Sequence, residues 1–302
     1  MRAEFFAYLR HLQTEIGDLV EMMEGKTKFQ VHSYSSSLEE GRLKLLQNGQ
    51  VLDKGSLHFY TRQFPVDPAV VPFLEVKKAA HQKVYENGLE LVFHPKNPNA
   101  PSILAHWQYS ELSGIGAEPL QRWVRCGLNL IPHYLIAEDA VYFHKVCREV
   151  CDPYHRDWYR RFKERCDRYY YNGLRRETLG IGGLYTGQLR PSKEVDLSRL
   201  FAFVKDLGEA FIPSYMPILE RRKDAPSVAK HKQWQAFRRS RFTEFNFLAD
   251  SRFSFFLQQS AHPDAVLSKL PPQADFAYEW EPEPGSREAK LAEVLRAPKD
   301  WV

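Results

Sequence analysis

The stretch NGLELVFHPKNPNAPSILAHWQYSEL, residues 87–112, decides the fold class of this chain. An Asn-Gly pair stands before a run of mainly apolar residues from Leu89 to His94, and this pair tolerates the positive φ that a tight turn demands. Prolines at positions 95, 98 and 101 then interrupt the run, and Ser102 to Leu112 has strand character again. We therefore predict two strands joined by a proline-rich loop.

The residues before this stretch extend the strand-rich region toward the N-terminus. Residues 27–94 contain short apolar segments with polar alternation, separated by Asn48-Gly49 and by Asp53-Lys54-Gly55. Such turn signals are typical of strands connected as hairpins. Residues 3–24 differ, because their apolar side chains recur at helical spacing up to Gly25, and we expect a helix there.

Helical spacing prevails in much of the second half of the chain. We expect helices over residues 137–151, 156–171, 197–219 and 287–295. Residues 241–248 alternate and are predicted to be a late strand, and residues 253–259 are a further candidate strand. Because strand-rich and helix-rich tracts follow each other without β-α-β alternation, the sequence predicts an α+β fold, one domain over residues 1–302 with a largely antiparallel sheet.

Composition narrows the class of protein and of ligand. The chain has 302 residues, of which 43% are hydrophobic and 26% charged, and these are the proportions of a globular rather than a disordered protein. A net charge of +4 does not form the concentrated patch that nucleic acid needs, but it suits an anionic small ligand. No run reaches the roughly 20 apolar residues of a membrane span, and the first residues lack the apolar centre of a signal peptide, so we expect a cytoplasmic protein without a membrane span.

Histidine and cysteine residues offer two candidate sites. His144, Cys147 and Cys151 fall on one face of the predicted helix 137–151. An imidazole and two thiolates can bind zinc, but no fourth ligand is indicated and small cysteines are common in cores, so no metal site is predicted. His94 stands at a strand end beside the proline-rich loop, where functional residues often lie, although a structural role is also open.

The glycine and arginine clusters do not identify the class of ligand. Gly180-Ile181-Gly182-Gly183 lacks the spacing of a nucleotide-binding loop. Residues 221–223 and 238–241 are basic clusters that either bind a carboxylate or phosphate through guanidinium groups or form solvated helix ends. From the residues alone, the sequence indicates an α+β protein with candidate anion-binding arginines.

Several stretches, in order along nearly the whole chain, resemble the oxygen-dependent coproporphyrinogen III oxidase family. Phe93 to Pro98 resembles the family's HPxNP loop, and residues 132–144 resemble its PYYLFEEDAxHFH segment. Further similar stretches lie at residues 180–183, 215–223, 241–246 and 278–302. The resemblance implies a flat antiparallel sheet with helices on both faces, a homodimer and a cleft for a tetrapyrrole. It also implies that two propionates of coproporphyrinogen III become vinyls, with O₂ as co-substrate and no obligatory metal or other cofactor.

The chain departs from the family pattern at positions that the resemblance assigns to chemistry. Asn129 stands where the family has a carboxylate, and an amide cannot act as a general base. Leu104 replaces the family's acid. Gln108 and Leu179 replace arginines, and Ser260-Ala261-His262 replaces Gly-Gly-Arg. We therefore expect a diverged member, a pseudoenzyme that binds a tetrapyrrole or related ligand and is impaired in decarboxylation. An active oxidase of haem biosynthesis and a different enzyme on the same fold are the alternatives.

The family pattern and the departures from it give two groups of candidate residues. The catalytic candidates are Asn129, His94, His106 and His144. The ligand-binding candidates are Arg125, Gln108, Trp107, His133, Arg241, Ser260 and His262. Leu104 and Leu174 are expected to add apolar lining. Because a buried carboxylate is costly without a partner, the ligand is expected to carry fewer carboxylates than coproporphyrinogen, or to place them toward Arg125 and Arg241.

Overall fold

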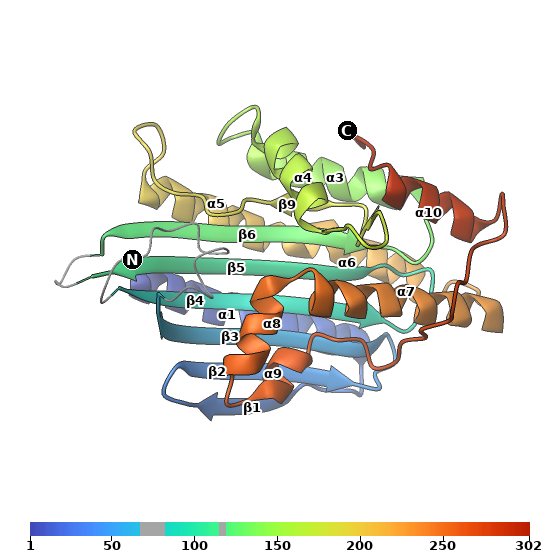
Figure 1. Ribbon diagram of the computed structural model, residues 1–302, viewed down its shortest axis with the longest axis horizontal. Helices are drawn as coiled ribbons and strands as arrows, with labels where there is room; N and C mark the ends of the chain where they lie inside the picture. Colours follow the sequence, from blue (N-terminus) through green and yellow to red (C-terminus); the bar gives the residue numbers. More distant parts are fainter. Residues whose placement is uncertain (67–81, 115–118) are drawn as a thin grey trace.

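A seven-stranded antiparallel sheet forms the centre of the computed structural model, which describes residues 1–66, 82–114 and 119–302 (Figure 1). Its strands are, in spatial order, β1 (Gln30–Ser35), β2 (Glu39–Gln47), β3 (Leu52–Pro65), β4 (Lys83–Pro95), β5 (Ser102–Ser113), β6 (Gln121–Ile131) and β9 (Gly183–Tyr185). A small ribbon is formed by β7 (Tyr171–Asn172) and β8 (Glu177–Thr178). The predicted class, α+β with a large antiparallel sheet, is confirmed.

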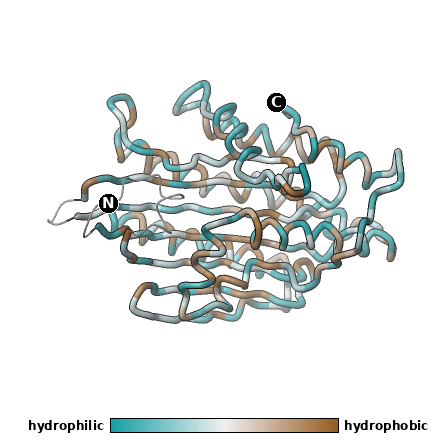
Figure 2. Tube along the Cα trace, in the orientation of Figure 1, coloured by the Kyte–Doolittle hydropathy of each residue, from teal (hydrophilic) through white to brown (hydrophobic). Residues whose placement is uncertain are grey.

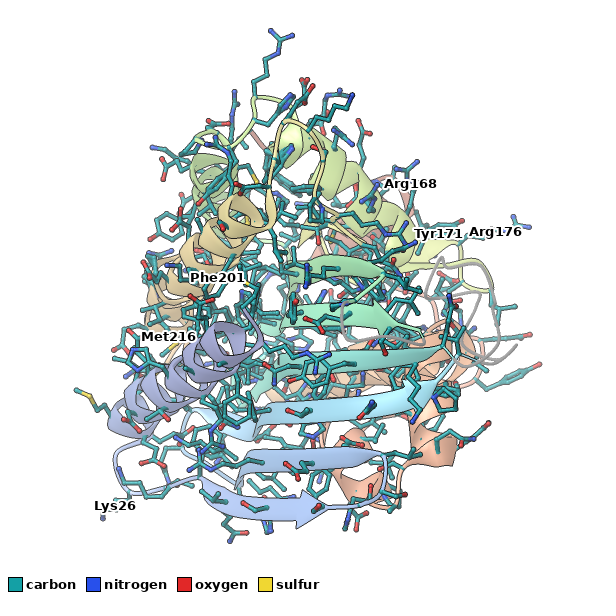
Figure 3. All side chains as sticks on the ribbon, turned by 90° about the vertical axis from the view of Figure 1, so that its left-hand side faces the viewer. Lys26, Arg168, Tyr171, Arg176, Phe201 and Met216 are labelled. Carbon is teal, nitrogen blue, oxygen red and sulfur yellow. The ribbon has the colours of Figure 1, made fainter. Side chains whose placement is uncertain are left out.

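The helices of the described residues are distributed over both faces of this sheet. They are α1 (Arg2–Glu24), α3 (Ala137–Cys151), α4 (Trp158–Tyr169), α5 (Leu197–Glu209), α6 (Phe211–Arg222), α7 (Ala229–Leu248), α8 (Ser251–Gln259), α9 (Pro263–Leu267) and α10 (Arg287–Arg296). In Figure 1, α8 and α9 lie in front of the strands, and α1 and α6 lie behind them. Figure 3, turned by 90°, shows α1 on one side of the sheet and the late helices on the other.

The two Asn-Gly pairs have different roles. Asn48, at φ 55°, closes the turn between β2 and β3, where its N–H donates to the carbonyl of Asp53 and the N–H of Gly49 donates to that of Leu52. Asn87-Gly88 lies inside β4 instead, opposite Thr61 and Tyr60 of β3. A Cβ at Gly88 would stand 2.5 Å from the Tyr60 ring, so this glycine gives room to a neighbouring aromatic side chain rather than a turn.

Alternation along the strands gives the sheet one apolar and one mixed face. Side chains such as Leu91, Trp107 and Leu128 point to the apolar face and pack in the main core with α1, α3, α5 and α6. No helix of the described residues is long and apolar enough to cross a membrane, and the apolar segments in Figure 2 are short and dispersed. The mixed face carries two smaller apolar clusters, one under α8 and α9 around Phe253 and one under α4 and α7 around Phe242.

The two late strands predicted at residues 241–248 and 253–259 are wrong, because these residues form the end of α7 and most of α8. Phe242 and Phe245 are buried at i and i+3, and so are Phe253 and Phe256. Over so short a stretch, the same apolar residues fit both the two-residue period of a strand and the three-to-four-residue period of a helix. The alternation therefore predicted the wrong kind of element. The sequence does contain a signal for the start of α8, because aspartate is a preferred residue at helix N-termini. In the structure the Asp250 side chain caps α8 by accepting hydrogen bonds from the N–H groups of residues 252 and 253.

Candidate ligand-binding site

A pocket of about 670 Å³, partly open to solvent, lies on the mixed face between the two smaller apolar clusters. We call it the central pocket. The sheet contributes His58, Tyr60, Arg62, Glu90, Leu104, His106, Gln108, Arg125 and Tyr185. The segments packed over the sheet contribute Tyr169, Tyr170, Asp250, Arg252, Phe253, Phe256, Val266 and Lys269. Its lining is far more polar than the core behind the sheet.

Strand register explains why these polar side chains meet. Residues paired across antiparallel strands point to the same face, and one row across the sheet is His58, Glu90, His106, Gly127 and Tyr185. Gly127 leaves space in this row, because a Cβ there would stand 2.9 Å from the His106 ring.

The next row holds Tyr60, Gly88, Gln108 and Arg125. Here Gly88 gives room to the Tyr60 ring, as described above. Each row therefore combines large polar side chains with one glycine, which opens the space between them.

Arg252, on α8, brings a cation into the second row. Its Nη2 donates to Oε2 of Glu86 at 2.9 Å and to Oε1 of Gln108 at 3.2 Å. The Gln108 amide in turn donates to Oε1 of Glu86 at 2.9 Å, and Tyr60 donates to Oε1 of Gln108 at 3.3 Å. Gln108 is thus held in a network that places the Arg252 guanidinium at its side.

Two carboxylates line the pocket beside Lys269. The Lys269 ammonium lies 3.0 Å from Glu90 and 3.9 Å from Asp250. Burial opposes ionisation of Glu90, but the charge and hydrogen bond of Lys269 outweigh it and lower the pKa of Glu90 to about 2. Glu90 is therefore ionised at neutral pH, although 28% of its side-chain surface remains accessible.

The pocket histidines are neutral at physiological pH. Burial, with the nearby Arg125 charge, lowers the pKa of His106 to about 3, and burial with the Arg62 charge lowers that of His58 to about 4. Nε2 of His106 is buried and has no hydrogen-bond partner within the described part of the chain. A ligand in the pocket can therefore form a hydrogen bond to this imidazole nitrogen.

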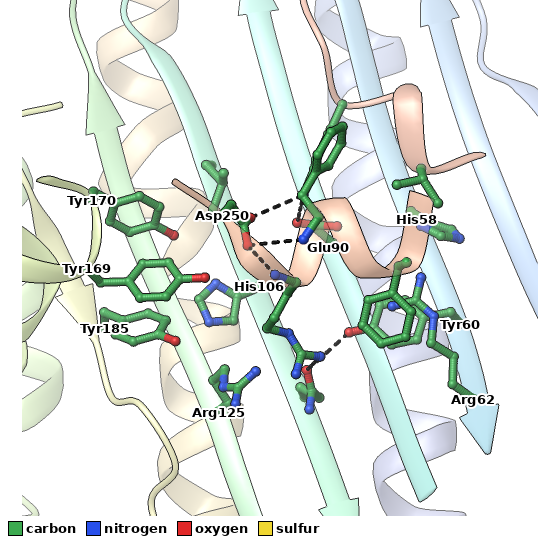
Figure 4. A pocket seen from close by; sticks show the side chains of 17 residues that line it. His58, Tyr60, Arg62, Glu90, His106, Arg125, Tyr169, Tyr170, Tyr185 and Asp250 are labelled. Atoms are coloured by element: carbon green, nitrogen blue, oxygen red, sulfur yellow. Dashed lines mark hydrogen bonds and ion pairs between the residues drawn. The ribbon is translucent and has the colours of Figure 1, made fainter. Parts of the chain in front are cut away.

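Tyrosines form the wall of the pocket opposite Tyr60 and Arg62 (Figure 4). The rings of Tyr169, from α4, and Tyr185, from β9, stack with centroids 4.0 Å apart and an angle of 17° between planes. The Tyr170 ring stands 6.1 Å from that of Tyr185. This wall offers a flat aromatic surface to a planar or puckered ring system.

Three of the predicted site residues, His106, Gln108 and Arg125, line the central pocket. His94 and Asn129 point to the same face of the sheet but lie outside the lining. His94 donates from Nε2 to the carbonyl of Lys269 at 2.9 Å. Asn129 is fully buried in register with Leu104, and neither atom of its amide has a hydrogen-bond partner among the described residues.

His144 and Trp107 lie away from the pocket. His144, on α3, donates from Nε2 to the carbonyl of Ile181 at 3.2 Å and contacts the Tyr159 hydroxyl at 3.0 Å through Nδ1. It and Asn129 therefore both lie beside the segment 180–183. Trp107 is buried in the main core on the other face. In the described part of the chain, no three His, Cys, Asp or Glu side chains gather to form a metal site.

The remaining candidates are also outside the central pocket. His133 is buried, 3.3 Å from the carbonyl of Ala100, and Arg241 forms an ion pair with Glu244 at 2.7 Å. Ser260 lines a neighbouring recess, and the His262 ring packs on that of Tyr34 at 4.4 Å. The predicted apolar lining is correct for Leu104 and wrong for Leu174, whose side chain is 75% exposed.

Comparison with known proteins decides the family. A sequence model described as coproporphyrinogen III oxidase matches residues 4–301. Two proteins named oxygen-dependent coproporphyrinogen-III oxidase, from the Nine Mile phase I and Henzerling II strains of Coxiella burnetii, are each 35% identical to the chain over 299 residues, which is 98% of this chain and 94% of each relative. The chain belongs to the coproporphyrinogen III oxidase family.

The family pattern can now be placed on the structure. Leu104, at the position of the family's acid, lines the pocket, whereas Leu179, at an arginine position, is buried in the apolar cluster under α4 and α7. Gln108, at another arginine position, has the Arg252 guanidinium as its neighbour. A cation from α8 therefore lies beside the Gln108 amide of β5.

Sequence reasoning missed most of the pocket on its helical side. The segments before Asp250, Arg252 and Lys269 were predicted as strands. That prediction gave no reason to place these three side chains near Gln108. No sequence motif indicated that Tyr169 and Tyr185 line the pocket. The capping signal at Asp250, followed two residues later by an arginine, was the feature of the sequence that could have placed α8 at the site.

Proposed function

We propose that the chain binds a tetrapyrrole with acidic side chains in the central pocket, and that the family's oxidative decarboxylation is slow in this protein. The main support for this proposal is that one pocket combines a flat tyrosine wall with cations. Tyr169 and Tyr185 offer a stacked surface to a ring system, while the Arg125 guanidinium lines the same pocket and attracts carboxylates.

Slow decarboxylation follows from the groups at the family's acid and base positions. Leu104 presents a side chain that neither donates nor accepts a proton, and the Asn129 amide is not a base in the physiological range. His106 does line the pocket, but a pKa of about 3 makes it a weak base. The scheme implied for the family therefore lacks the two groups on which its proton transfers depend.

The pocket carboxylates favour a second candidate, namely that the chain catalyses the oxidation for which its relatives are named. In the family scheme a carboxylate takes up the pyrrole N–H proton. Two propionates each lose CO₂ and a hydride from the β-carbon and remain as vinyl groups, and O₂ accepts the two electrons of each conversion and is reduced to H₂O₂. Asp250 suits this role better than Glu90, because Lys269 lies 3.9 Å from Asp250 but directly hydrogen-bonds Glu90 at 3.0 Å. No obligatory metal or organic cofactor is part of this proposal.

Binding can be tested by titrating the protein with coproporphyrin III and following porphyrin and protein fluorescence. We expect Tyr185→Ala to weaken binding by about tenfold, because it removes half of the stacked wall. Tyr171→Ala is the matched control, since Tyr171 is exposed on β7 and does not line the pocket. Absence of porphyrin binding to the unaltered protein would refute the proposal.

Turnover separates the two candidates. Coproporphyrinogen III is loaded without oxygen, O₂ is admitted, and protoporphyrinogen is measured after its oxidation to the porphyrin. A rate more than about a hundredfold below that of a Coxiella relative supports the slow-turnover proposal. A comparable rate supports the second candidate and shows that a group other than those at positions 104 and 129 supplies the acid and base.

We also propose that the chain forms a homodimer and acts in the cytoplasm, as the family resemblance and the sequence suggested. Sedimentation equilibrium checks the first statement, and a mass of one chain at micromolar concentration would contradict it.

A further inference from the structure

A second hollow adjoins the central pocket. We call it the outer recess. It encloses about 1080 Å³, partly open to solvent, and shares Arg125, Tyr169, Tyr185 and Arg252 with the central pocket. Beyond these shared residues it is lined by Arg165, Arg168, Gly187, Gln188, Ala249 and Ser251. The two hollows therefore adjoin, because the stacked tyrosines line both.

The lining of the outer recess is strongly basic. Among the residues that the structure describes, it contains four arginines and neither aspartate nor glutamate. Arg165 and Arg168 lie three residues apart on α4, so they emerge from one side of the helix. Neither forms an ion pair with any carboxylate in the part of the chain that the structure describes, whereas Arg160 of the same helix pairs with Glu164 at 3.1 Å.

Arg165 is held in place by its surroundings. Its guanidinium donates to the carbonyl of Thr186, and its Nη1 would stand 2.9 Å from a Cβ at Gly187, which has φ 60°. Arg165 is half-buried and Arg168 is exposed. Figure 3 shows Arg168 on the side of the molecule away from α5, toward the mixed face.

We propose that the outer recess is a carboxylate subsite that holds acidic side chains of the ligand whose ring system stacks on Tyr169 and Tyr185. The inference rests on the proposed tetrapyrrole binding and assigns a ligand class to it, namely rings with more acidic groups than the inner cations can receive. Inside the central pocket, Arg252 already pairs with Glu86 and Lys269 with Glu90. Arg62 pairs with Glu39 at 3.0 Å. Carboxylates that these inner cations do not receive can reach the cations at Arg165 and Arg168 in the adjoining recess.

This subsite reverses one expectation from the sequence. The loss of arginines at positions 108 and 179 predicted a ligand with fewer carboxylates than coproporphyrinogen, or one whose carboxylates lie toward Arg125 and Arg241. The outer recess instead favours a tetracarboxylate over a dicarboxylate, because α4 supplies two further guanidinium groups at the mouth of the pocket.

The test compares coproporphyrin III, with four carboxylates, and deuteroporphyrin IX, with two, in fluorescence titrations at two salt concentrations. We expect the unaltered protein to prefer coproporphyrin III, and the double variant Arg165→Gln, Arg168→Gln to lose about tenfold in affinity for it. Affinity for deuteroporphyrin IX should change by less than about threefold, and the salt dependence of coproporphyrin binding should decrease.

Arg161→Gln is the matched control, because Arg161 is an exposed arginine of α4 that lines neither hollow. Gly187→Ala is a second probe, since its methyl group displaces Arg165 without removing a charge, and it should reproduce part of the loss. If both porphyrins bind but their affinity ratio is the same in the double variant, the carboxylate subsite is refuted and tetrapyrrole binding stands. If neither porphyrin binds the unaltered protein, both proposals fail together.

Discussion

The guanidinium group of Arg252, on α8, lies 3.2 Å from Oε1 of Gln108, on β5. The two residues are 144 positions apart in the chain, and the carboxylate of Glu86 binds both of them. Position 108, at which the resemblance implied an arginine, thus has a cation beside it that comes from another element. Restoring the family residue at position 108 would therefore place two guanidinium groups against one carboxylate.

This crowding leads to a prediction for Gln108→Arg. We expect the variant to lose about 3 kcal/mol of stability, because the side chain at position 108 is 3% exposed and Glu86 can neutralise one cation, not two. We expect no gain in porphyrin affinity. Urea unfolding and porphyrin titration measure the two effects. Adding Arg252→Gln should recover most of the stability, and a single variant as stable as the unaltered protein would contradict the explanation.

Asp250→Asn separates the chemistry of this side chain from its capping of α8. Asparagine caps helices about as well as aspartate, so we expect stability to change by less than about 0.5 kcal/mol. If Asp250 removes the pyrrole proton, whatever decarboxylation the protein performs should decrease by at least about a hundredfold. Single-turnover measurements on pre-loaded protein test this. Unchanged turnover with unchanged stability would exclude Asp250 as the base.

Buried His94 should make the fold sensitive to mild acid. Burial, with the Arg239 charge, lowers the pKa of His94 to about 3, against about 6.5 in the unfolded chain. The unfolded state therefore binds more protons between these values, so the stability is fully present above pH 6.5 and decreases as the pH falls toward 3. Between pH 7 and pH 5 this group accounts for a loss of about 2 kcal/mol. His94→Gln should reduce the pH dependence of urea unfolding by that amount, and an unchanged slope would contradict the pKa.

Gly88→Ala and Gly127→Ala should differ in their effects. The new methyl group at position 88 meets the Tyr60 ring, which can rotate, whereas that at position 127 meets the carbonyl oxygen of Leu184 at 2.5 Å. We expect Gly127→Ala to cost about 3 kcal/mol of stability and Gly88→Ala about 1 kcal/mol with a larger effect on ligand affinity. Thermal unfolding and porphyrin titration distinguish the two. Tyr60→Ala should relieve the effect of Gly88→Ala on stability, and equal costs at both glycines would contradict this account.

Local signals sufficed for much of the fold. The helix predicted at residues 3–24 is α1, the strands at 89–94 and 102–112 lie in β4 and β5, and the predicted helix at 137–151 has the bounds of α3. These segments are long, or they are bounded by glycine and proline. Residues 241–259 failed because their phenylalanines satisfy two periods over a short distance.

The site could be predicted only in part, because register and tertiary packing decide it. His106, Gln108 and Arg125 came from the family pattern and do line the pocket. Nothing in the local sequence shows that Glu90 pairs with His58 and His106 across three strands, or that Lys269 approaches it from beyond α9. Such neighbours are fixed by hydrogen-bond pairing between distant segments, and that information is not contained in any one of them.

The alternation along β5 has a consequence for how this protein can evolve. Leu104, His106 and Gln108 line the central pocket, while the residues between them, Ala105, Trp107 and Tyr109, are buried in the main core. One strand therefore carries two alternating sets of side chains, one that forms the pocket and one that packs the core, and selection acts on each set separately. Substitutions at every second position can exchange one ligand chemistry for another, while the intervening positions preserve the architecture through the change.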